Sequence, residues 1–96
     1  MILSFANKLA EDLFEDRQTK EVRNFPFELH RVARRKILYL HAAAELKDLK
    51  IPPGNRLEAL KGNRAGFYSI RINLQWRIVF KWCNGNAEEL EVIDYH

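Results

Sequence analysis

Three side chains capable of acid–base chemistry stand together in this sequence: Asp94, Tyr95 and His96, an acid, a phenol and an imidazole. Histidine is the usual proton carrier at neutral pH, because its unperturbed pKa is ~6.5. Metal-independent cleavage of RNA by transesterification needs such groups, since the 2′-hydroxyl must lose a proton and the leaving 5′-oxygen must gain one. The tripeptide therefore suggests an RNA-cleaving site. The pattern alone favours a plainer interpretation, in which His96 is a frayed chain end.

Cleavage of RNA also requires positive side chains that bind the phosphate and stabilise its developing charge. The second half of the chain supplies them, interleaved with aromatic residues whose faces can stack on unpaired bases. The positive residues are Arg56, Lys61, Arg64, Arg71, Arg77 and Lys81, and the aromatic residues are Phe67, Tyr68, Trp76, Trp82 and Tyr95. Most of these aromatic residues are expected in the hydrophobic core, so the pattern taken alone indicates RNA binding only weakly.

Other kinds of catalytic or binding site are not indicated. The sequence has no G-x-S-x-G, P-loop or G-x-G-x-x-G motif. His30 and His41 share a predicted helix face, but a separation of ~16 Å along the helix is too large for one metal ion. The single cysteine, Cys83, excludes an intrachain disulfide. We therefore expect neither a metal ion nor a cofactor.

Length and composition indicate one domain spanning residues 1–96. A net charge of +3 and a pI of about 9.2 favour polyanionic partners. Charged residues such as Lys8 and Glu11 interrupt the apolar N-terminal stretch, which argues against a signal peptide. No segment reaches the ~20 apolar residues of a membrane span. The expectation is a soluble, cytoplasmic protein that does not associate with membranes.

The N-terminal half of the sequence has the period of helices. Apolar spacing predicts a helix over residues 6–15 and a longer one over residues 24–44. Residues 1–5 are a candidate edge strand, residues 17–24 a loop and residues 43–50 a short helical turn. The longer helix would present a basic outer face, which either faces solvent or contacts nucleic acid or an acidic partner: His30, Arg31, Arg34 and Arg35.

From residue 56 onward the apolar pattern has period two, which is typical of strands. In one strand, Trp76, Ile78, Phe80 and Trp82 share the face expected to pack on the helices. Arg77 then lies on the opposite, polar face. Helices followed by strands predict an α+β fold, with two N-terminal helices packed on a mostly antiparallel sheet of four to five strands. The predicted strands cover residues 56–61, 67–72, 76–82 and 90–94.

A family resemblance adds to this interpretation. The segment NRLEALKGNRAGFYSIRINLQWRIVF, the terminal VIDYH, the opening MILSF and the length resemble the HigB toxins of bacterial toxin–antitoxin systems, within the RelE superfamily. The resemblance implies a compact α+β fold and a ribosome-dependent endoribonuclease that cuts mRNA in the decoding site without a metal ion. It also implies a HigA-type helix-turn-helix antitoxin, through which any contact with operator DNA would be made.

The resemblance also implies roles for particular residues. Lys61 of the LKG motif would contact phosphate, and Arg77 of QWR would stabilise the transition state. Asp94, Tyr95 and His96 of DYH would complete the catalytic set, and His96 would act as acid or base. Further contacts to RNA phosphates are expected from Arg56, Arg64 and Arg71.

One position departs from the family pattern. Many members have a histidine in LHPLKG where this chain has Glu58 in LEALKG. Glu58 can serve as an additional base or can be inert, so the number of proton carriers stays open. This departure keeps an alternative function in view, a RelE-fold module that binds the ribosome or an antitoxin with weak or no RNase activity. A general basic RNA-binding domain is a third reading.

Overall fold

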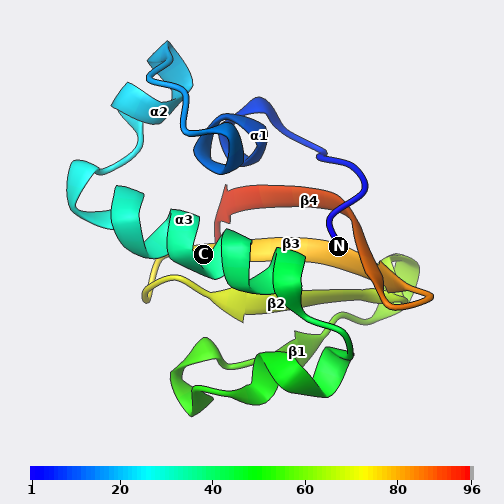
Figure 1. The fold of residues 1–96 in the computed structure, drawn as a ribbon. Helices are drawn as coiled ribbons and strands as arrows, with labels where there is room; N and C mark the ends of the chain where they lie inside the picture. The colour runs from blue at the N-terminus through cyan, green and yellow to red at the C-terminus, as the bar shows by residue number, and fades with distance from the viewer. Residues whose placement is uncertain (96) are drawn as a thin grey trace.

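The computed structural model describes residues 1–95, and within them the longest helix covers one face of a four-stranded antiparallel sheet while the two shorter α-helices lie beside its last strand (Figure 1). The α-helices are α1 (Lys8–Glu15), α2 (Lys20–Asn24) and α3 (His30–Ala42). The strands, which lie in the order β1-β2-β3-β4, are β1 (Glu58–Ala59), β2 (Phe67–Arg71), β3 (Trp76–Cys83) and β4 (Asn86–Asp94). Short 3-10 helices lie in the connections: η1 (Phe27–Leu29), η2 (Leu46–Lys50), η3 (Pro53–Asn55) and η4 (Gly62–Arg64). The α+β class and the antiparallel sheet are as the sequence predicts.

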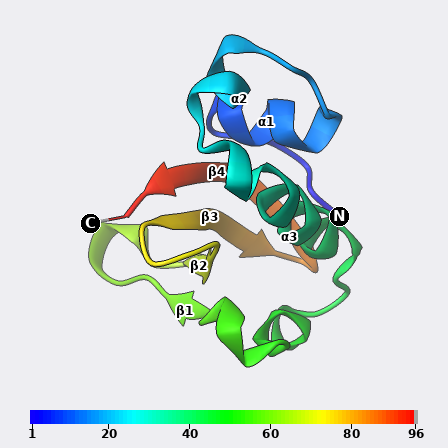
Figure 2. The ribbon, with the colours of Figure 1, turned by 90° about the vertical axis from the view of Figure 1, so that its left-hand side faces the viewer.

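The central strand β3 separates two different faces of the sheet. Ile78 and Phe80 are fully buried and belong to one core with Ile37 and Leu40 of α3. Arg77 alternates with them and therefore lies on the opposite face. Figure 2 shows α3 on the right of the sheet and the loop between β1 and β2 on its left, the face opposite the helices. The alternation predicted for β3 is confirmed.

The structure corrects the prediction that residues 17–24 form a loop, because they contain α2. The Thr19 side chain caps this helix by accepting a hydrogen bond from the Val22 amide at 3.5 Å. Val22 is buried, with 2% of its surface exposed. One apolar residue in a helix of five residues produces no detectable period, so only the capping residue signalled the helix.

A buried carboxylate joins α1 to α2. Asp12 accepts hydrogen bonds from Lys8 Nζ at 2.5 Å, from Thr19 Oγ1 at 2.7 Å and from Arg17 Nη1 at 3.3 Å. The hydrogen bond from Lys8, followed by the one from Thr19, holds the pKa of Asp12 below its usual range. The α1–α2 corner is therefore held by charge as well as by apolar packing.

The long helix predicted over residues 24–44 is shorter than expected. The chain is extended at Phe25 and forms η1 after Pro26, before α3 begins at His30. His30 also departs from the expected outer face: its ring is half-buried and stacks on Phe25 with 5.7 Å between centroids. Its Nε2 lies 2.8 Å from the Phe25 carbonyl oxygen. The segment before α3 is thus folded back against the helix.

The first residues do not form the expected edge strand but follow the outer edge of β4. Two isolated parallel bridges pair Ile2 with Ala87 and Phe5 with Leu90. The Leu3 amide donates to the Ala87 carbonyl at 2.8 Å, which satisfies a group that an edge strand would expose. As a result the sheet presents little free edge on this side.

Two strands differ in length from the prediction. The first predicted strand, over residues 56–61, is reduced to the two residues of β1, and β4 begins at Asn86 rather than at residue 90. β3 and β4 change register between Val79 and Lys81, where Glu89 has a φ of 51°. Within residues 1–95, no helix has the length and hydropathy needed to cross a membrane.

Candidate active site

Arg77 is a buried guanidinium on the polar face of the sheet, with 5% of its surface exposed. Its Nε donates to Ser69 Oγ at 2.9 Å. Its Nη2 donates to the Arg56 carbonyl at 2.6 Å and to the Ser69 carbonyl at 3.4 Å. Within residues 1–95, Nη1 has no such acceptor, so it can donate to a bound anion. The side chain is therefore fixed before any substrate arrives.

Two acidic or aromatic groups lie beside this guanidinium. The pairing of Glu58 with Ser69 brings the Glu58 carboxylate to 3.9 Å from Arg77 Nη2. The Tyr95 ring lies over the guanidinium, with 5.6 Å between the guanidinium carbon and the ring centroid. Burial lowers the pKa of Arg77, the charge of Glu58 opposes this shift, and the nearby charge of Arg71 adds to it. Arginine nevertheless stays protonated in proteins, so the site has a permanent positive charge.

The end of β4 is fastened to the start of β3. The Tyr95 amide donates to the Gln75 carbonyl at 2.6 Å, and Gln75 Nε2 donates to Asp94 Oδ2 at 2.8 Å. Asp94 pairs with Trp76, the residue that precedes Arg77 on β3. These contacts hold Tyr95 above Arg77 and place Asp94 at the adjoining strand end. His96 lies outside the described residues.

Two of the other predicted phosphate-binding residues, Arg71 and Arg56, lie next to Arg77. Arg71 pairs directly with Arg77 across β2 and β3. Arg56 has a left-handed backbone with a φ of 49°, and its carbonyl rather than its side chain contacts Arg77. Arg71 therefore adds positive charge at the level of Arg77, and the backbone of Arg56 orients that guanidinium.

Lys61 and Arg64 lie at the opposite end of the sheet. The Leu60 amide donates to the Phe67 carbonyl at 2.9 Å, which places Lys61 beside the start of β2. Arg77 pairs with Arg71 at the other end of β2. At ~3.3 Å per residue along the strand from Phe67 to Arg71, Lys61 and Arg77 are ~13 Å apart. Arg64 forms an ion pair with Glu91 at 3.3 Å, and its guanidinium carbon lies 4.9 Å from the centroid of the Phe67 ring. The structure does not bring these two residues together with Arg77.

Sequence reasoning missed the residues that hold Arg77 in place. Ser69 is fully buried on the same strand face as Arg71, and a small polar residue at that position was the available signal. Asn55 is also buried, and its Nδ2 donates to the carbonyls of Leu49 at 3.2 Å and Ile51 at 3.4 Å. The Asn55 side chain accepts a hydrogen bond from Lys36, whose pKa is lowered by burial. Asn55 therefore fixes the loop whose next carbonyl binds Arg77.

The arrangement is suited to binding and stabilising a phosphate. A fixed guanidinium in a largely buried position stabilises developing negative charge without reorganising during the reaction. A carboxylate and a phenol stand next to it, at positions from which proton transfer or substrate orientation is feasible. Within residues 1–95, no group of three or more His, Cys, Asp and Glu side chains has the geometry of a metal site.

Comparison with known proteins points to one family. The family model described as "RelE-like toxin of type II toxin-antitoxin system HigB" matches residues 3–96. Toxin HigB-1 of Vibrio cholerae is 44% identical over 87 residues, which cover 91% of this chain and 90% of that protein. A shorter match, 46% identical over 41 residues, covers 43% of this chain and 45% of Endoribonuclease HigB of Proteus vulgaris. The YoeB dimer of Staphylococcus aureus shares the fold, with a TM-score of 0.58 at 18% identity over 99% of this chain and 97% of that one.

Proposed function

The chain belongs to the HigB-like, RelE-like toxins of type II toxin–antitoxin systems, and from this we propose that it is an endoribonuclease that cuts translated mRNA on the ribosome. The family resemblance expected from the LKG and QWR motifs is confirmed. One curated relative has the name Endoribonuclease HigB, which supports the reaction proposed for this chain. The observation that carries the proposal is the buried, hydrogen-bonded guanidinium of Arg77 between Glu58 and Tyr95.

In the proposed reaction, Arg77 stabilises the phosphorane. The 2′-oxygen of the substrate forms a bond to phosphorus, and the bond from phosphorus to the 5′-oxygen breaks. Negative charge builds on the non-bridging oxygens, where a guanidinium fixed by Ser69 and the Arg56 carbonyl supplies a charge-assisted donor. Because these hydrogen bonds already hold the side chain, little ordering is needed in the transition state.

We assign the two proton transfers to Glu58 and to His96 of the DYH motif. Glu58, whose carboxylate lies 3.9 Å from Arg77 Nη2, takes the proton of the 2′-hydroxyl. His96 of the DYH motif gives a proton to the leaving 5′-oxygen, a role in which histidine is common because imidazole changes charge near neutral pH. Tyr95 orients the scissile nucleotide above Arg77. Asp94, which accepts a hydrogen bond from Gln75, fixes the strand end that leads to Tyr95 and His96.

The remaining basic residues extend the substrate surface along the sheet. Arg71 lies level with Arg77, whereas Lys61 and Arg64 lie ~13 Å away along the strands. We assign them to phosphates on neighbouring nucleotides of an extended mRNA. A HigA-type helix-turn-helix antitoxin is the proposed partner, and operator DNA is contacted only through it. The proposed site of action is the cytoplasm, where ribosomes translate mRNA.

The test is to induce the protein in cells and map mRNA 5′ ends within minutes. The wild type should produce new cleavage ends inside translated frames, and Arg77→Ala should abolish them. Arg23→Ala, on the exposed surface of α2, is the matched control and should cleave like the wild type. Growth arrest with intact transcripts would instead favour the second candidate function, a ribosome- or antitoxin-binding module, for which the departure at Glu58 is the specific observation.

A further inference from the structure

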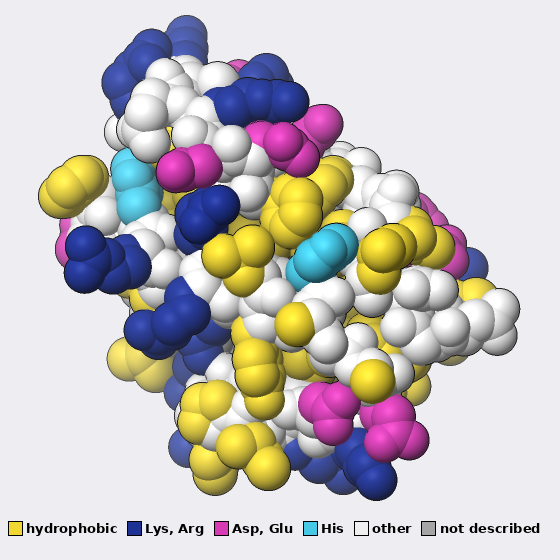
Figure 3. Space-filling view, viewed as in Figure 1, with side chains coloured by type: hydrophobic (Ala, Val, Ile, Leu, Met, Phe, Trp, Pro, Cys, Tyr) yellow, Lys and Arg dark blue, Asp and Glu magenta, His cyan; other side chains and the backbone are white. Residues whose placement is uncertain are grey.

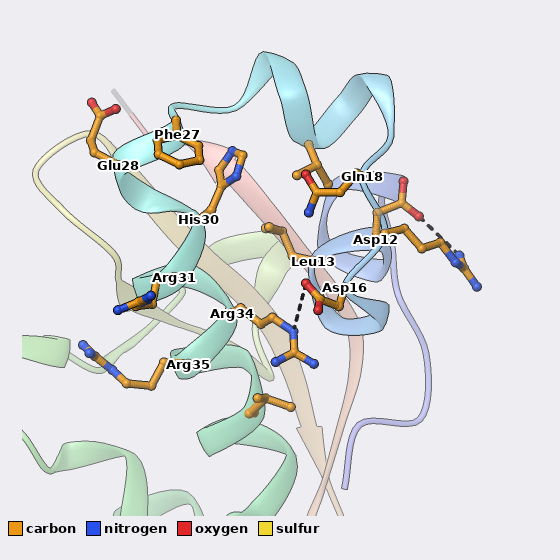
Figure 4. Close-up of a pocket in the computed structure, with 13 residues that line it drawn as sticks. Asp12, Leu13, Asp16, Gln18, Phe27, Glu28, His30, Arg31, Arg34 and Arg35 are labelled. Carbon is orange, nitrogen blue, oxygen red and sulfur yellow. Dashed lines mark hydrogen bonds and ion pairs between the residues drawn. The ribbon is translucent and has the colours of Figure 1, made fainter.

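A groove of about 870 Å³ lies on the helical side of the protein, away from Arg77. One wall is the α1–α2 corner, with Asp16 and Gln18, and the other wall is η1 and α3 (Figure 4). Leu13 and Val22, both nearly fully buried, contribute apolar surface to the lining. The proposed reaction uses none of these residues.

The α3 wall carries a stripe of side chains at helical spacing. Arg31, Arg35 and Leu38 follow one another at intervals of four and three residues and so lie on one side of α3, and Phe27 of η1 lines the same groove just before them. Phe27 is 84% exposed and Leu38 is 39% exposed. The stripe thus has apolar groups at its two ends and positive charges between them, and Figure 3 shows dark blue basic side chains among yellow hydrophobic ones over α3.

The positive charge of this groove is only partly neutralised. Arg34 Nε lies 3.9 Å from Asp16 Oδ1 across the groove, and Arg34 Nη2 donates to the Phe14 carbonyl at 3.4 Å. Arg31 and Arg35 are exposed and pair with no acidic side chain among residues 1–95. The buried carboxylate of Asp12 is already bound by Lys8 and Arg17. Two guanidinium groups one helical turn apart are therefore available to a partner.

We propose that this groove is the docking site for an acidic amphipathic helix of the antitoxin, an inference that rests on the proposed function. The exposed Phe27 and Leu38 would receive apolar side chains of that helix, and the two guanidiniums would pair with carboxylates spaced three or four residues apart. The stripe from residue 27 to residue 38 spans ~16 Å, which matches about three helical turns. Recognition by an apolar helix face laid in a groove is a common mode of peptide binding.

The same features favour a protein segment over RNA as the occupant. A phosphate backbone gains nothing from the apolar ends of the stripe, Phe27 and Leu38, whereas the apolar face of a helix can bury them. The substrate of the proposed reaction is also handled on the opposite side of the sheet, where Arg77 and Tyr95 lie.

The test measures binding of the toxin to the purified product of the antitoxin gene that adjoins its own. The double variant Arg31→Glu/Arg35→Glu should bind about 100-fold more weakly, because it places like charges against the acidic helix. Phe27→Ala should bind about tenfold more weakly without loss of folding, since this ring is mostly exposed. The control Lys47→Glu/Lys50→Glu makes the same change of charge on exposed residues of η2 and should bind like the wild type.

Ribosome-dependent cleavage is measured on the same variants without antitoxin, and amide hydrogen exchange is measured on the wild-type complex. Cleavage within twofold of wild type and new protection over residues 12–38 support the groove. Unchanged antitoxin affinity of the double variant, or protection confined to residues 56–77, overturns the inference and leaves the proposed function standing. Loss of cleavage with retained antitoxin binding also overturns it and assigns the groove to RNA. Failure of the wild type to cleave RNA or to bind the antitoxin overturns the proposed function and this inference together.

Discussion

Arginines in two regions of the protein, the sheet and α3, differ in burial and in hydrogen bonding. Arg77 on the sheet is buried, and its Nε and Nη2 donate to Ser69 and to the Arg56 carbonyl. Arg31 and Arg35 on α3 are exposed and pair with no acidic side chain among residues 1–95. A guanidinium fixed in advance is suited to a transition state, whereas exposed guanidiniums are suited to a partner that brings its own carboxylates. We therefore assign the proposed reaction to the buried, fixed arginine and the proposed docking to the exposed ones.

The largest effect is expected when the fixed guanidinium is changed but its charge is kept. Arg77→Lys removes the planar fork that contacts Ser69 and the Arg56 carbonyl, and one ammonium cannot replace it. Single-turnover cleavage on programmed ribosomes should slow by about 10²–10³-fold. Arg35→Lys is the matched change in the exposed set and should leave cleavage unchanged. Equal effects of the two substitutions would remove the distinction between the two sets.

The carboxylate beside Arg77 is the next strongest test. Glu58→Gln keeps the shape of the side chain but removes its basicity, so the cleavage rate should fall by about 100-fold if Glu58 takes the 2′-proton. Glu58→His restores a proton carrier at this position and should retain most of the wild-type rate. A Gln variant with the full rate would show that Glu58 is inert and that the base lies elsewhere.

A smaller effect is expected from the loop that supports Arg77. Asn55→Ala removes the hydrogen bonds to the Leu49 and Ile51 carbonyls and leaves buried polar groups unpaired, which costs about 1–3 kcal/mol in the free energy of unfolding. The loop positions Arg77 indirectly, so kcat should fall by about tenfold with little change in KM. Denaturant unfolding and ribosome cleavage assays measure the two effects. A lower stability with unchanged kcat would mean that Asn55 serves the fold alone.

The smallest effect concerns the corner that forms one wall of the groove. Because the folded-state pKa of Asp12 is lowered by Lys8 and Thr19, its stabilisation is present above its unfolded pKa of ~3.9 and is lost as pH falls through the lower folded value. Melting temperatures of the wild type and Asp12→Asn should therefore differ above pH ~5. The difference should begin to shrink near pH ~3.9 and vanish once the pH is below the folded pKa of Asp12. A difference that is constant from pH 2 to pH 7 would contradict a charged Asp12 in the folded state.

The sequence indicated the sheet and its faces because strand periodicity is local. Trp76, Ile78 and Phe80 alternate with Arg77, and this alone places the arginine opposite the helices. The groups that fix Arg77 were not predictable in the same way, because Arg56 supplies a backbone carbonyl from 21 residues away and Ser69 is one small residue in a strand. The LKG motif gave no indication that Lys61 lies far from Arg77 along the sheet. Sequence patterns identified the candidate reactive groups, and long-range hydrogen bonds determine where the structure places them.

The pairing of the first residues with β4 has a consequence for synthesis of the toxin. The Ala87 amide donates to the Met1 carbonyl at 2.9 Å, and the Leu90 amide donates to the Ser4 carbonyl at 3.1 Å. Contacts so distant in sequence form only after the intervening chain has been made, and they close the fold late. Tyr95 reaches Arg77 at the same stage. A nascent chain that still holds these residues inside the ribosome that makes it therefore lacks both a closed sheet edge and an assembled candidate site, and we expect no cleavage before residue 95 has emerged.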